Sequence, residues 1–348
     1  MSNSRLILGM SLTLSILAAA CGSSNASKPA TTSSTTTPAK LTHITMVEAV
    51  SAPAYAPVTL AKSAGFFKKN GLDVTVAPLQ AGSTAVQALV GGGAQFDAGV
   101  ASDVLIADSK GVGLISIAAL TNSINLYIEI NKQYAASKGI TSSDPLNQRL
   151  LALKGANIGI TAPGSITDLA VRMMMSSVGL KSGVDYHEIS IGSPAANLSE
   201  LTTGTIQATI FDPSYSRLAT NKGVGILGVK ATEFPALKDA AFGAVIVSKK
   251  YASANPTIVK EVATAFAETN NFIHDHPNQA LADIDKLYPT ISPAILAYSV
   301  PLYGFAVNAA TNATAWKNMA QVLVQNGELT ASQAATVETQ YTNQYVPS

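Results

Sequence analysis

The chain has 348 residues, with 22 basic against 21 acidic side chains and only 12% charged residues. It contains no basic run and no interleaving of basic with aromatic residues, which argues against nucleic acid as a partner. After residue 20, no apolar stretch reaches the roughly 18 residues that a membrane-spanning helix requires. We therefore expect a folded body that lies outside the lipid bilayer.

The first 20 residues are typical of a secretory signal peptide. Arg5 precedes an apolar run over residues 6–20, and small residues precede Cys21, the only cysteine. Cys21 stands where a bacterial lipoprotein is acylated, although Ala18 occupies a position where leucine is commoner. Residues 21–40 are rich in Ser, Thr and Pro, which predicts a disordered tether. These features predict an extracytoplasmic protein that is attached to the membrane only through a lipid on Cys21.

Strand and helix signals alternate along the body. Strand-like segments at 43–50, 72–79, 96–101 and 112–120 are separated by helical segments at 56–71, 82–93 and 102–111. The order repeats with strands at 126–132, 157–163, 185–192, 207–212 and 224–229, and with helices from Ser165 to near Gly179 and at 195–204. Short loops between alternating strands and helices predict parallel, doubly wound α/β sheets.

An internal repeat indicates two similar lobes. Residues 82–98 read "GSTAVQALVGGGAQFDA", and residues 192–208 read "GSPAANLSELTTGTIQA". Two late helices, at 255–277 and 312–329, are expected to return to the first lobe and lock the hinge. We therefore assign residues 41–124 and 250–348 to lobe 1, and residues 125–249 to lobe 2.

Reactive side chains are scarce. The four histidines are His43, His187, His274 and His276, and none follows the pattern of a hydrolase triad. The spacing "IHDHP" at 273–277 is compatible with a metal ligand pair, but imidazoles at a helix C-terminus also complement the helix dipole. We expect no metal, no cofactor and no enzymatic reaction.

The hypothesis that the protein binds a ligand rests on five strand-to-helix junctions: residues 51–57, 80–85, 100–103, 162–168 and 211–215. In an open parallel sheet such junctions share the carboxyl edge, where ligands bind. Helix N-termini there offer free N–H groups, and Tyr55 and Tyr215 offer flat apolar walls. The alternative is ordinary helix capping, since Ser165 with Asp168 fits a variant of the capping box.

The motifs resemble a known family. "YAPVTLAKSAGFFKKNGLDVTVAPLQAGSTAVQALVGGGAQFDAGVASDVLIADSKG" (55–111) and "LKGANIGITAPGSITDLAVRMMMSSVGL" (153–180) are similar to nitrate/sulfonate/taurine-type substrate-binding proteins of ABC importers and to the thiamine-pyrimidine-synthase-like group. The resemblance implies a type II periplasmic-binding-protein fold, with two α/β lobes joined by a hinge. It also implies a monomer that delivers a small-molecule ligand to an ABC permease and its ATPase.

Ligand contacts carried over from the family by position fall at Tyr55, Ser83, Thr84, Ser102, Ser165, Thr167 and Asp212, and Tyr215 joins them from the junction pattern. The ligand remains open between a sulfonate, a nitrate-like anion, a pyrimidine and another small heterocycle. No Arg or Lys lies in the five junctions, whereas Glu48, Asp103, Asp168 and Asp212 lie near the same edge. These carboxylates favour an amine-bearing, zwitterionic or aromatic-heterocyclic ligand; the alternative is that they serve in capping and in hydrogen bonds between the lobes. The alternative functions are a thiamine-pyrimidine-synthase-like enzyme and a surface sensor without a transporter.

Overall fold

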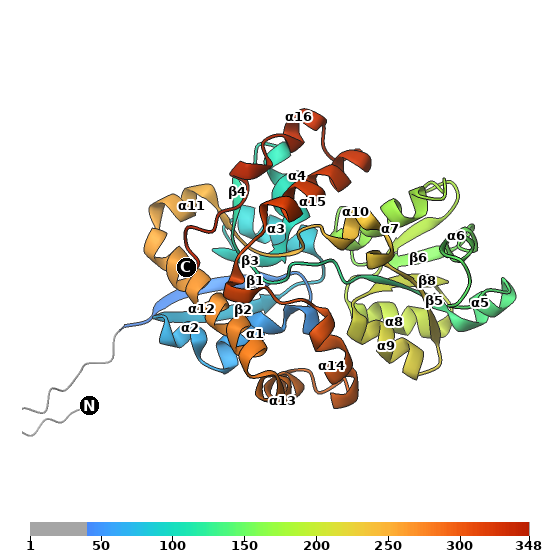
Figure 1. Cartoon of the computed structure of the whole chain (residues 1–348), viewed down its shortest axis with the longest axis horizontal. Helices are drawn as coiled ribbons and strands as arrows, with labels where there is room; N and C mark the ends of the chain where they lie inside the picture. The colour runs from blue at the N-terminus through green and yellow to red at the C-terminus, as the bar shows by residue number, and fades with distance from the viewer. Residues whose placement is uncertain (1–39, 348) are drawn as a thin grey trace, which may run out of the picture. The chain divides into compact units, whose positions relative to one another are not determined.

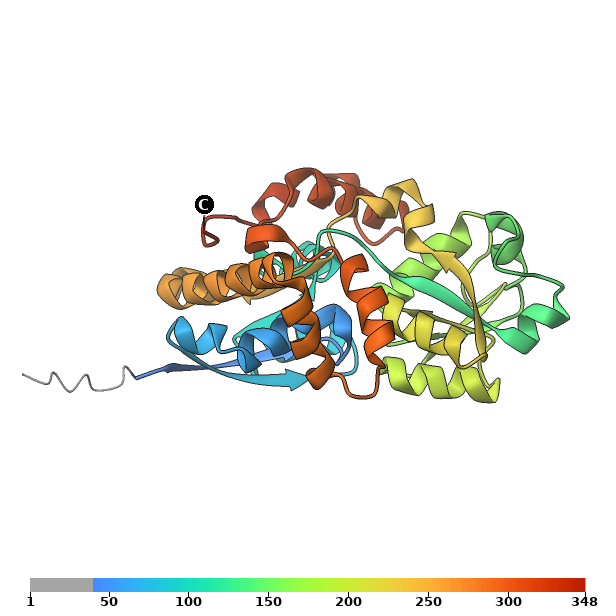
Figure 2. The same cartoon turned by 60° about the horizontal axis from the view of Figure 1, so that its bottom comes forward.

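Two five-stranded sheets organise the residues that the computed structural model describes, 40–347 (Figure 1). Helices cover both faces of each sheet, so that each sheet and its helices form one lobe (Figures 1 and 2). The predicted signal peptide, the tether up to residue 39 and the lipid site at Cys21 lie outside the described residues. Within residues 40–347, no helix combines the length and the apolar character that crossing a bilayer demands.

Lobe 1 contains the sheet β2–β1–β3–β10–β4. Its strands are β1 (Thr42–Glu48), β2 (Leu72–Pro78), β3 (Phe96–Val100), β4 (Leu114–Ala119) and β10 (Gly243–Ser248). The first helices of this lobe are α1 (Ala56–Ser63), α2 (Phe66–Lys69), α3 (Gly82–Val90) and α4 (Ala101–Ser109). The single helix predicted over 56–71 is interrupted because Gly65 has a φ of 82°, a left-handed conformation that a helix interior does not contain.

Lobe 2 contains the sheet β7–β6–β8–β5–β9. Its strands are β5 (Tyr127–Asn131), β6 (Asn157–Ile160), β7 (His187–Ser190), β8 (Ala208–Phe211) and β9 (Gly225–Lys230). Its helices are α5 (Lys132–Ser137), α6 (Leu146–Leu151), α7 (Ile166–Ser176), α8 (Pro194–Thr203), α9 (Pro213–Asn221) and α10 (Pro235–Lys238).

The two sheets have the same topology, which confirms the prediction of two similar lobes. In chain order, β1, β2 and β3 of lobe 1 take the places that β6, β7 and β8 take in lobe 2. The two halves of the sequence repeat therefore fold into equivalent units, α3 with β3 and α8 with β8. Each unit begins with a strand-to-helix junction at the carboxyl edge of its sheet.

Two predictions about the sheets were wrong. The sheets are mixed, because β10 runs antiparallel to β3 and β4, and β5 runs antiparallel to β8 and β9. In addition, β10 belongs to lobe 1, whereas the sequence assigned residues 125–249 to lobe 2. Both differences have one cause: a chain that arrives from the other lobe enters the sheet at its carboxyl edge and must run backwards. Gly243 of β10 pairs with Val100 at the end of β3, and Tyr127 of β5 pairs with Phe211 at the end of β8.

The helices after β10 are α11 (Lys249–Ala254), α12 (Pro256–Asp275), α13 (Pro277–Leu287), α14 (Pro293–Ser299), α15 (Ala313–Gln325) and α16 (Ala331–Ala334). As predicted, α12 and α15 pack on lobe 1, where they contact α1 and α4 respectively. The ring of Phe266 on α12 lies 5.4 Å from the ring of Phe67 in an edge-on arrangement. Helix α14 goes further and packs on α9 of lobe 2 (Figure 2, orange-red).

The hydrophobic core is continuous between the lobes on the side of α14. One buried cluster joins Leu60 of α1, Phe211 and Tyr215 of lobe 2, and Leu296 of α14. Burying apolar surface from both lobes stabilises their closed arrangement by roughly 25 cal/mol per Å². The C-terminal region therefore links the lobes as a third connection, besides the two segments that cross between the sheets.

Candidate functional site

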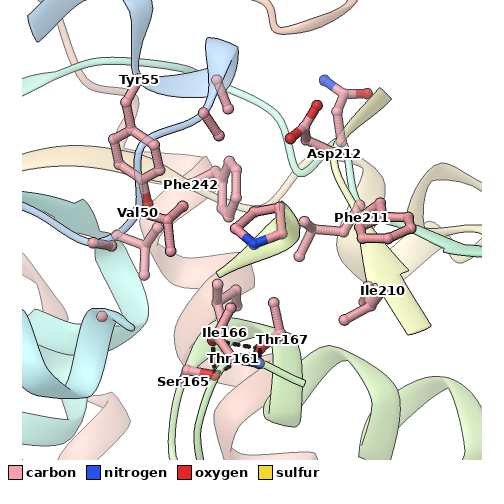
Figure 3. Close-up of a pocket in the computed structure, with 18 of the residues that line it drawn as sticks. Val50, Tyr55, Thr161, Ser165, Ile166, Thr167, Ile210, Phe211, Asp212 and Phe242 are labelled. Carbon is pink, nitrogen blue, oxygen red and sulfur yellow. Dashed lines mark hydrogen bonds between the residues drawn. The ribbon is translucent and has the colours of Figure 1, made fainter. Parts of the chain in front are cut away.

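A cavity lies between the lobes, at the carboxyl edges of both sheets (Figure 3). It offers about 70 Å³ to the centres of water molecules. A dry cavity of about 150 Å³ holds benzene, so the cavity in this closed arrangement suits a molecule of a few non-hydrogen atoms. All five junctions that the sequence singled out contribute to its walls, through Tyr55, Gly82, Val100, Ser165 and Asp212 among others.

Tyr55 forms the lobe 1 wall together with the loop that follows β1. It ends a short 3-10 helix over Pro53–Tyr55, is 9% exposed, and its hydroxyl forms no hydrogen bond with any described residue. Burial raises the pKa of Tyr55 well above its ordinary value, and the carboxyl groups of Asp103, Asp97 and Glu48 raise it further. The hydroxyl therefore stays protonated and is available to donate or accept a hydrogen bond at the cavity.

Three hydroxyls of lobe 2 form a closed triangle at the opposite wall (Figure 3). The Oγ1 of Thr161 lies 2.9 Å from Oγ of Ser165 and 2.8 Å from Oγ1 of Thr167, and the last two lie 2.7 Å apart. The backbone N–H of Thr161 donates to Oγ1 of Thr167 over 3.0 Å. These contacts hold the loop between β6 and α7 in one conformation.

Ser165 stands at the N-cap of α7, yet its side chain does not cap the helix. Its hydroxyl donates instead to the carbonyl of Ala162 over 2.7 Å. Asp168 accepts from the N–H of Gly164 over 2.7 Å and pairs with Arg172 over 2.9 Å. The capping-box interpretation of Ser165 with Asp168 is therefore wrong, and Asp168 is occupied by a structural ion pair outside the cavity lining.

Asp212 is the only charged side chain among the described residues that line the cavity. It caps α9, and its Oδ1 accepts from the N–H of Ser214 over 2.7 Å, from the Ser214 hydroxyl over 2.5 Å and from the Tyr303 hydroxyl over 2.8 Å. Burial raises the pKa of Asp212, while these hydrogen bonds oppose the rise. Its Oδ2 has no hydrogen-bond partner among residues 40–347 and is not fully enclosed.

The segments that cross between the lobes supply the remaining walls. Thr121, Ser123 and Asn125 come from the first crossing, and Phe242 comes from the second. The amide of Asn125 donates to Oγ of Ser123 over 2.9 Å and also to the carbonyl of Leu302. A hinge motion would therefore change the walls of the cavity directly.

The predicted site residues fall into two groups. The structure brings Tyr55, Ser165, Thr167 and Asp212 together around the cavity. Ser83 lies in a separate surface depression beside Asp103 and Glu328, and Thr84 is exposed. Ser102 is fully buried, and its hydroxyl has no hydrogen-bond partner in the part of the chain that the structure describes. Tyr215 packs in the cluster around Phe211. The structure thus places these four residues away from the cavity lining.

Several polar or aromatic side chains that line the cavity were not assigned from the sequence: Thr121, Ser123, Asn125, Thr161, Asn197, Phe242 and Tyr303. Thr161 stands immediately before the junction 162–168, which the sequence had singled out. Asn125 and Phe242 lie in the crossings, which are recognised only once the hinge is known. Tyr303 lies 91 residues from its partner Asp212, and no local pattern connects the two.

Three further carboxyl groups lie buried behind Tyr55. Glu48 ends β1, and burial raises its pKa to about 7. Burial also raises the pKa of Asp103 to about 7, and it raises the pKa of Asp97 well above its ordinary value, with a further contribution from Asp103. Oε2 of Glu48 and both carboxyl oxygens of Asp97 have no hydrogen-bond partner within residues 40–347.

The histidine pair of the "IHDHP" segment lies at the end of α12, where His274 and Asp275 are exposed. Among residues 40–347, no three side chains of His, Cys, Asp or Glu are grouped so that they would hold a metal ion.

Comparison with known proteins agrees with this architecture. The model of the NMT1-like family matches residues 38–284. The nitrate/nitrite binding protein NrtA of Synechocystis sp. is 23% identical over 254 residues, which cover 70% of this chain and 55% of that protein. The bicarbonate transport ATP-binding protein CmpC of Synechocystis sp. is 27% identical over 180 residues, which cover 49% of this chain and 26% of that protein. The chain thus spans about half or less of the curated relatives that it matches.

Solved structures show the same fold. A protein from Bordetella bronchiseptica superposes with a TM-score of 0.73 at 22% identity, over 87% of this chain and 95% of that one. The periplasmic nitrate-binding protein NrtA from Synechocystis superposes with a TM-score of 0.70 at 18% identity, over 88% of this chain and 87% of that one. The alkanesulfonate-binding protein SsuA from Xanthomonas axonopodis, bound to MOPS, superposes with a TM-score of 0.68 at 15% identity, over 86% of this chain and 98% of that one. The resemblance inferred from the motifs is confirmed: the chain belongs to the NMT1-like family and has the two-lobed type II periplasmic-binding-protein fold.

Proposed function

We propose that this protein captures a small organic solute between its lobes and delivers it to an ABC-type importer. The observation that carries the proposal is the cavity enclosed by strand-to-helix junctions from both lobes and by both crossing segments. A solute in this position contacts both lobes at once only when they are closed. Because it binds the closed arrangement more tightly than an open one, the solute shifts the population towards closure.

The relatives support a role in transport. The similar proteins are a nitrate/nitrite binding protein, a bicarbonate transport ATP-binding protein and an alkanesulfonate-binding protein. In our proposal the partners are a permease and an ATPase, and the chain acts as a monomer. Recovery of the bound solute in unchanged form would support capture without a reaction, whereas conversion of the solute would favour the enzymatic alternative.

We also propose that the protein is held at the outer face of the cell membrane through a lipid on Cys21. A spacer of 20 residues, 21–40, would separate the anchor from β1. Expression in a bacterial host followed by mass spectrometry of the N-terminal peptide tests the proposal. A diacylglyceryl mass on Cys21 is expected, and its loss in Cys21→Ala should release the protein from the membrane fraction.

A thermal-shift screen with the full chain tests solute capture. A ligand at 100 times its Kd stabilises a protein by about 2.7 kcal/mol, so a binder among amines, sulfonates, nitrate, pyrimidines and amino acids should raise Tm by several degrees. Val50→Trp, which fills the cavity from lobe 1, should abolish the shift. Val184→Trp is the matched control, because Val184 is 76% exposed. An undiminished shift in Val50→Trp would place the ligand elsewhere.

A further inference from the structure

The charge and the walls of the cavity point to a specific class of ligand. We propose that the solute is a small organic cation, of the alkylammonium type, whose charge is matched by Asp212 and whose body packs against the aromatic walls. This inference rests on the proposed function, because it assigns the ligand class of the same cavity.

Asp212 supplies the recognising group. It is only 7% exposed, and four donors on Oδ1, including the N–H of Tyr215, fix the orientation of its carboxylate. The second oxygen, Oδ2, accepts no hydrogen bond from residues 40–347 and is not fully enclosed, and the side chain lines the cavity. Because the Asp212 side chain is largely removed from water, a donor from a ligand would stabilise its carboxylate. An ammonium N–H in the cavity would give it a charge-assisted hydrogen bond.

Within residues 40–347, the surroundings of Asp212 supply no positive charge that would pair with its carboxylate. Among the described residues, the cavity lining contains no Lys, Arg or His. Behind the Tyr55 wall, Glu48 and Asp97 are at most 1% exposed and keep unpaired carboxyl oxygens. Charges interact more strongly in a buried environment than in water. The carboxylate of Asp212, with no cationic side chain beside it among the described residues of the lining, repels nitrate and sulfonate and attracts a cation.

The walls fit an organic cation better than a hydrated metal ion. Phe211, Phe242, Tyr55 and Tyr303 all line the cavity, and Figure 3 shows the ring of Phe242 and the carboxylate of Asp212 at the same space. Aromatic faces attract ammonium groups through cation–π interaction, which strengthens when the ion is desolvated. Val50, Ile166 and Ile210 complete an apolar surface for alkyl groups.

The lobe 2 hydroxyls do not argue for an anion. Thr161, Ser165 and Thr167 satisfy one another in their triangle, and Ser165 also donates to a carbonyl. Their hydrogen atoms are therefore largely engaged within the loop. An anion at this wall would have to replace these contacts, whereas a cation near Asp212 leaves them in place.

Calorimetric titration of the full chain tests the assignment. The probes are propylammonium and tetramethylammonium chloride, with n-propanol as the uncharged control and sodium nitrate and methanesulfonate as the anions. At least one cation should bind, and the uncharged and anionic probes should not. Asp212→Asn keeps a capping oxygen for α9 and should weaken cation binding by about 10- to 100-fold. Asp275→Asn, an exposed aspartate at the end of α12, is the matched control and should bind like the wild type.

Phe242→Leu is the second variant, in case Asp212→Asn does not fold. It keeps an apolar wall but removes the ring, and it should weaken tetramethylammonium binding several-fold. Nitrate or methanesulfonate binding that Val50→Trp abolishes would overturn the cation assignment while supporting solute capture in the cavity. Unchanged cation affinity in both Asp212→Asn and Phe242→Leu would also overturn it. If no probe binds, the cation assignment is wrong, and the wider thermal-shift screen alone decides the proposed function.

Discussion

The hydroxyl of Tyr303 donates a hydrogen bond of 2.8 Å to Oδ1 of Asp212, and both groups are buried. Tyr303 follows the short 3-10 helix Val300–Leu302 in the C-terminal region, whereas Asp212 caps α9 in lobe 2. The contact therefore joins the third connection between the lobes to the charged group of the cavity. A change in the position of α14 would reach the ligand site through this pair.

Tyr303→Phe should loosen the closed arrangement. The variant removes one donor from a buried carboxylate, which typically costs about 1.5–3 kcal/mol for a hydrogen bond to a charged group. The two donors from Ser214 remain, so α9 should keep its cap. Denaturant unfolding should show the loss, and hydrogen exchange should rise in α14 and α9.

The substitution Tyr298→Phe is the control for this experiment, because Tyr298 on α14 is 42% exposed. Equal stability of Tyr303→Phe and the wild type, together with unchanged hydrogen exchange in α9, would show that the hydrogen bond between Tyr303 and Asp212 does not stabilise the closed arrangement.

Glu48→Gln should stabilise the protein at high pH and have little effect at low pH. Burial raises the pKa of Glu48 from 4.5 to about 7, so the folded protein binds this proton more tightly than the unfolded chain. The resulting stability is fully present below pH 4.5 and is lost as the pH rises to about 7. At pH 8 the free energy of unfolding of the variant should therefore exceed that of the wild type by about 1–3 kcal/mol.

The measurement is urea unfolding of both proteins at pH 4.5 and pH 8 without ligand. Asp283→Asn on α13, whose carboxylate pairs with Lys286 near the surface, is the matched control. A difference between Glu48→Gln and the wild type that does not change with pH would contradict the assigned ionisation.

Thr167→Val should destabilise the loop before α7. The substitution keeps the shape but removes the oxygen that accepts from the Thr161 N–H and that completes the hydroxyl triangle. Leaving the partly buried N–H of Thr161 without an acceptor should cost about 1 kcal/mol. Thr203→Val, on an exposed site at the end of α8, should cost much less. Comparable unfolding free energies for the two variants would mean that water replaces the lost acceptor.

Cation binding should weaken as the solution becomes acidic. Only the ionised form of Asp212 attracts an ammonium group, and burial raises the pKa of Asp212 above its ordinary 3.8. Affinity should therefore be constant at high pH and fall as the pH drops through the raised pKa, by up to about tenfold per pH unit. Glu48 and Asp103, whose pKa values lie at about 7, should add a shallower loss at higher pH.

Titration of propylammonium from pH 8 down to the lowest pH at which the protein stays folded measures this dependence. Asp212→Asn should remove the steep part of the profile. Affinity that increases towards low pH would contradict the role of the carboxylates, because it is the behaviour expected of an anion in a negatively charged cavity.

The lobes themselves were predictable from local patterns. The alternation of strands and helices predicted the sheets, and the repeat at residues 82–98 and 192–208 predicted the two similar lobes. The reversed direction of β10 was not predictable in the same way, because it depends on which edge of the sheet the chain meets after crossing from lobe 2. No residue within 243–248 encodes that direction.

The cavity was predictable only in part, for a related reason. Its junction residues, such as Tyr55, Ser165 and Asp212, follow strands and could be placed at the carboxyl edge from the sequence. Phe242 and Tyr303 reach the cavity through the return crossing and the path of α14, which are set by packing between distant segments. The exclusion of Thr84 and Tyr215 likewise depends on how each helix rotates against its sheet.

A crystal structure of the full chain with the tightest-binding probe tests most directly whether a solute is held between the lobes. Density is expected between Tyr55 and Asp212, in contact with side chains of both lobes. If the probe is propylammonium, its nitrogen should lie at hydrogen-bond distance from Oδ2 of Asp212. Density on the outer surface of a single lobe, with the space between Tyr55 and Asp212 unchanged, would contradict the capture of a solute between the lobes.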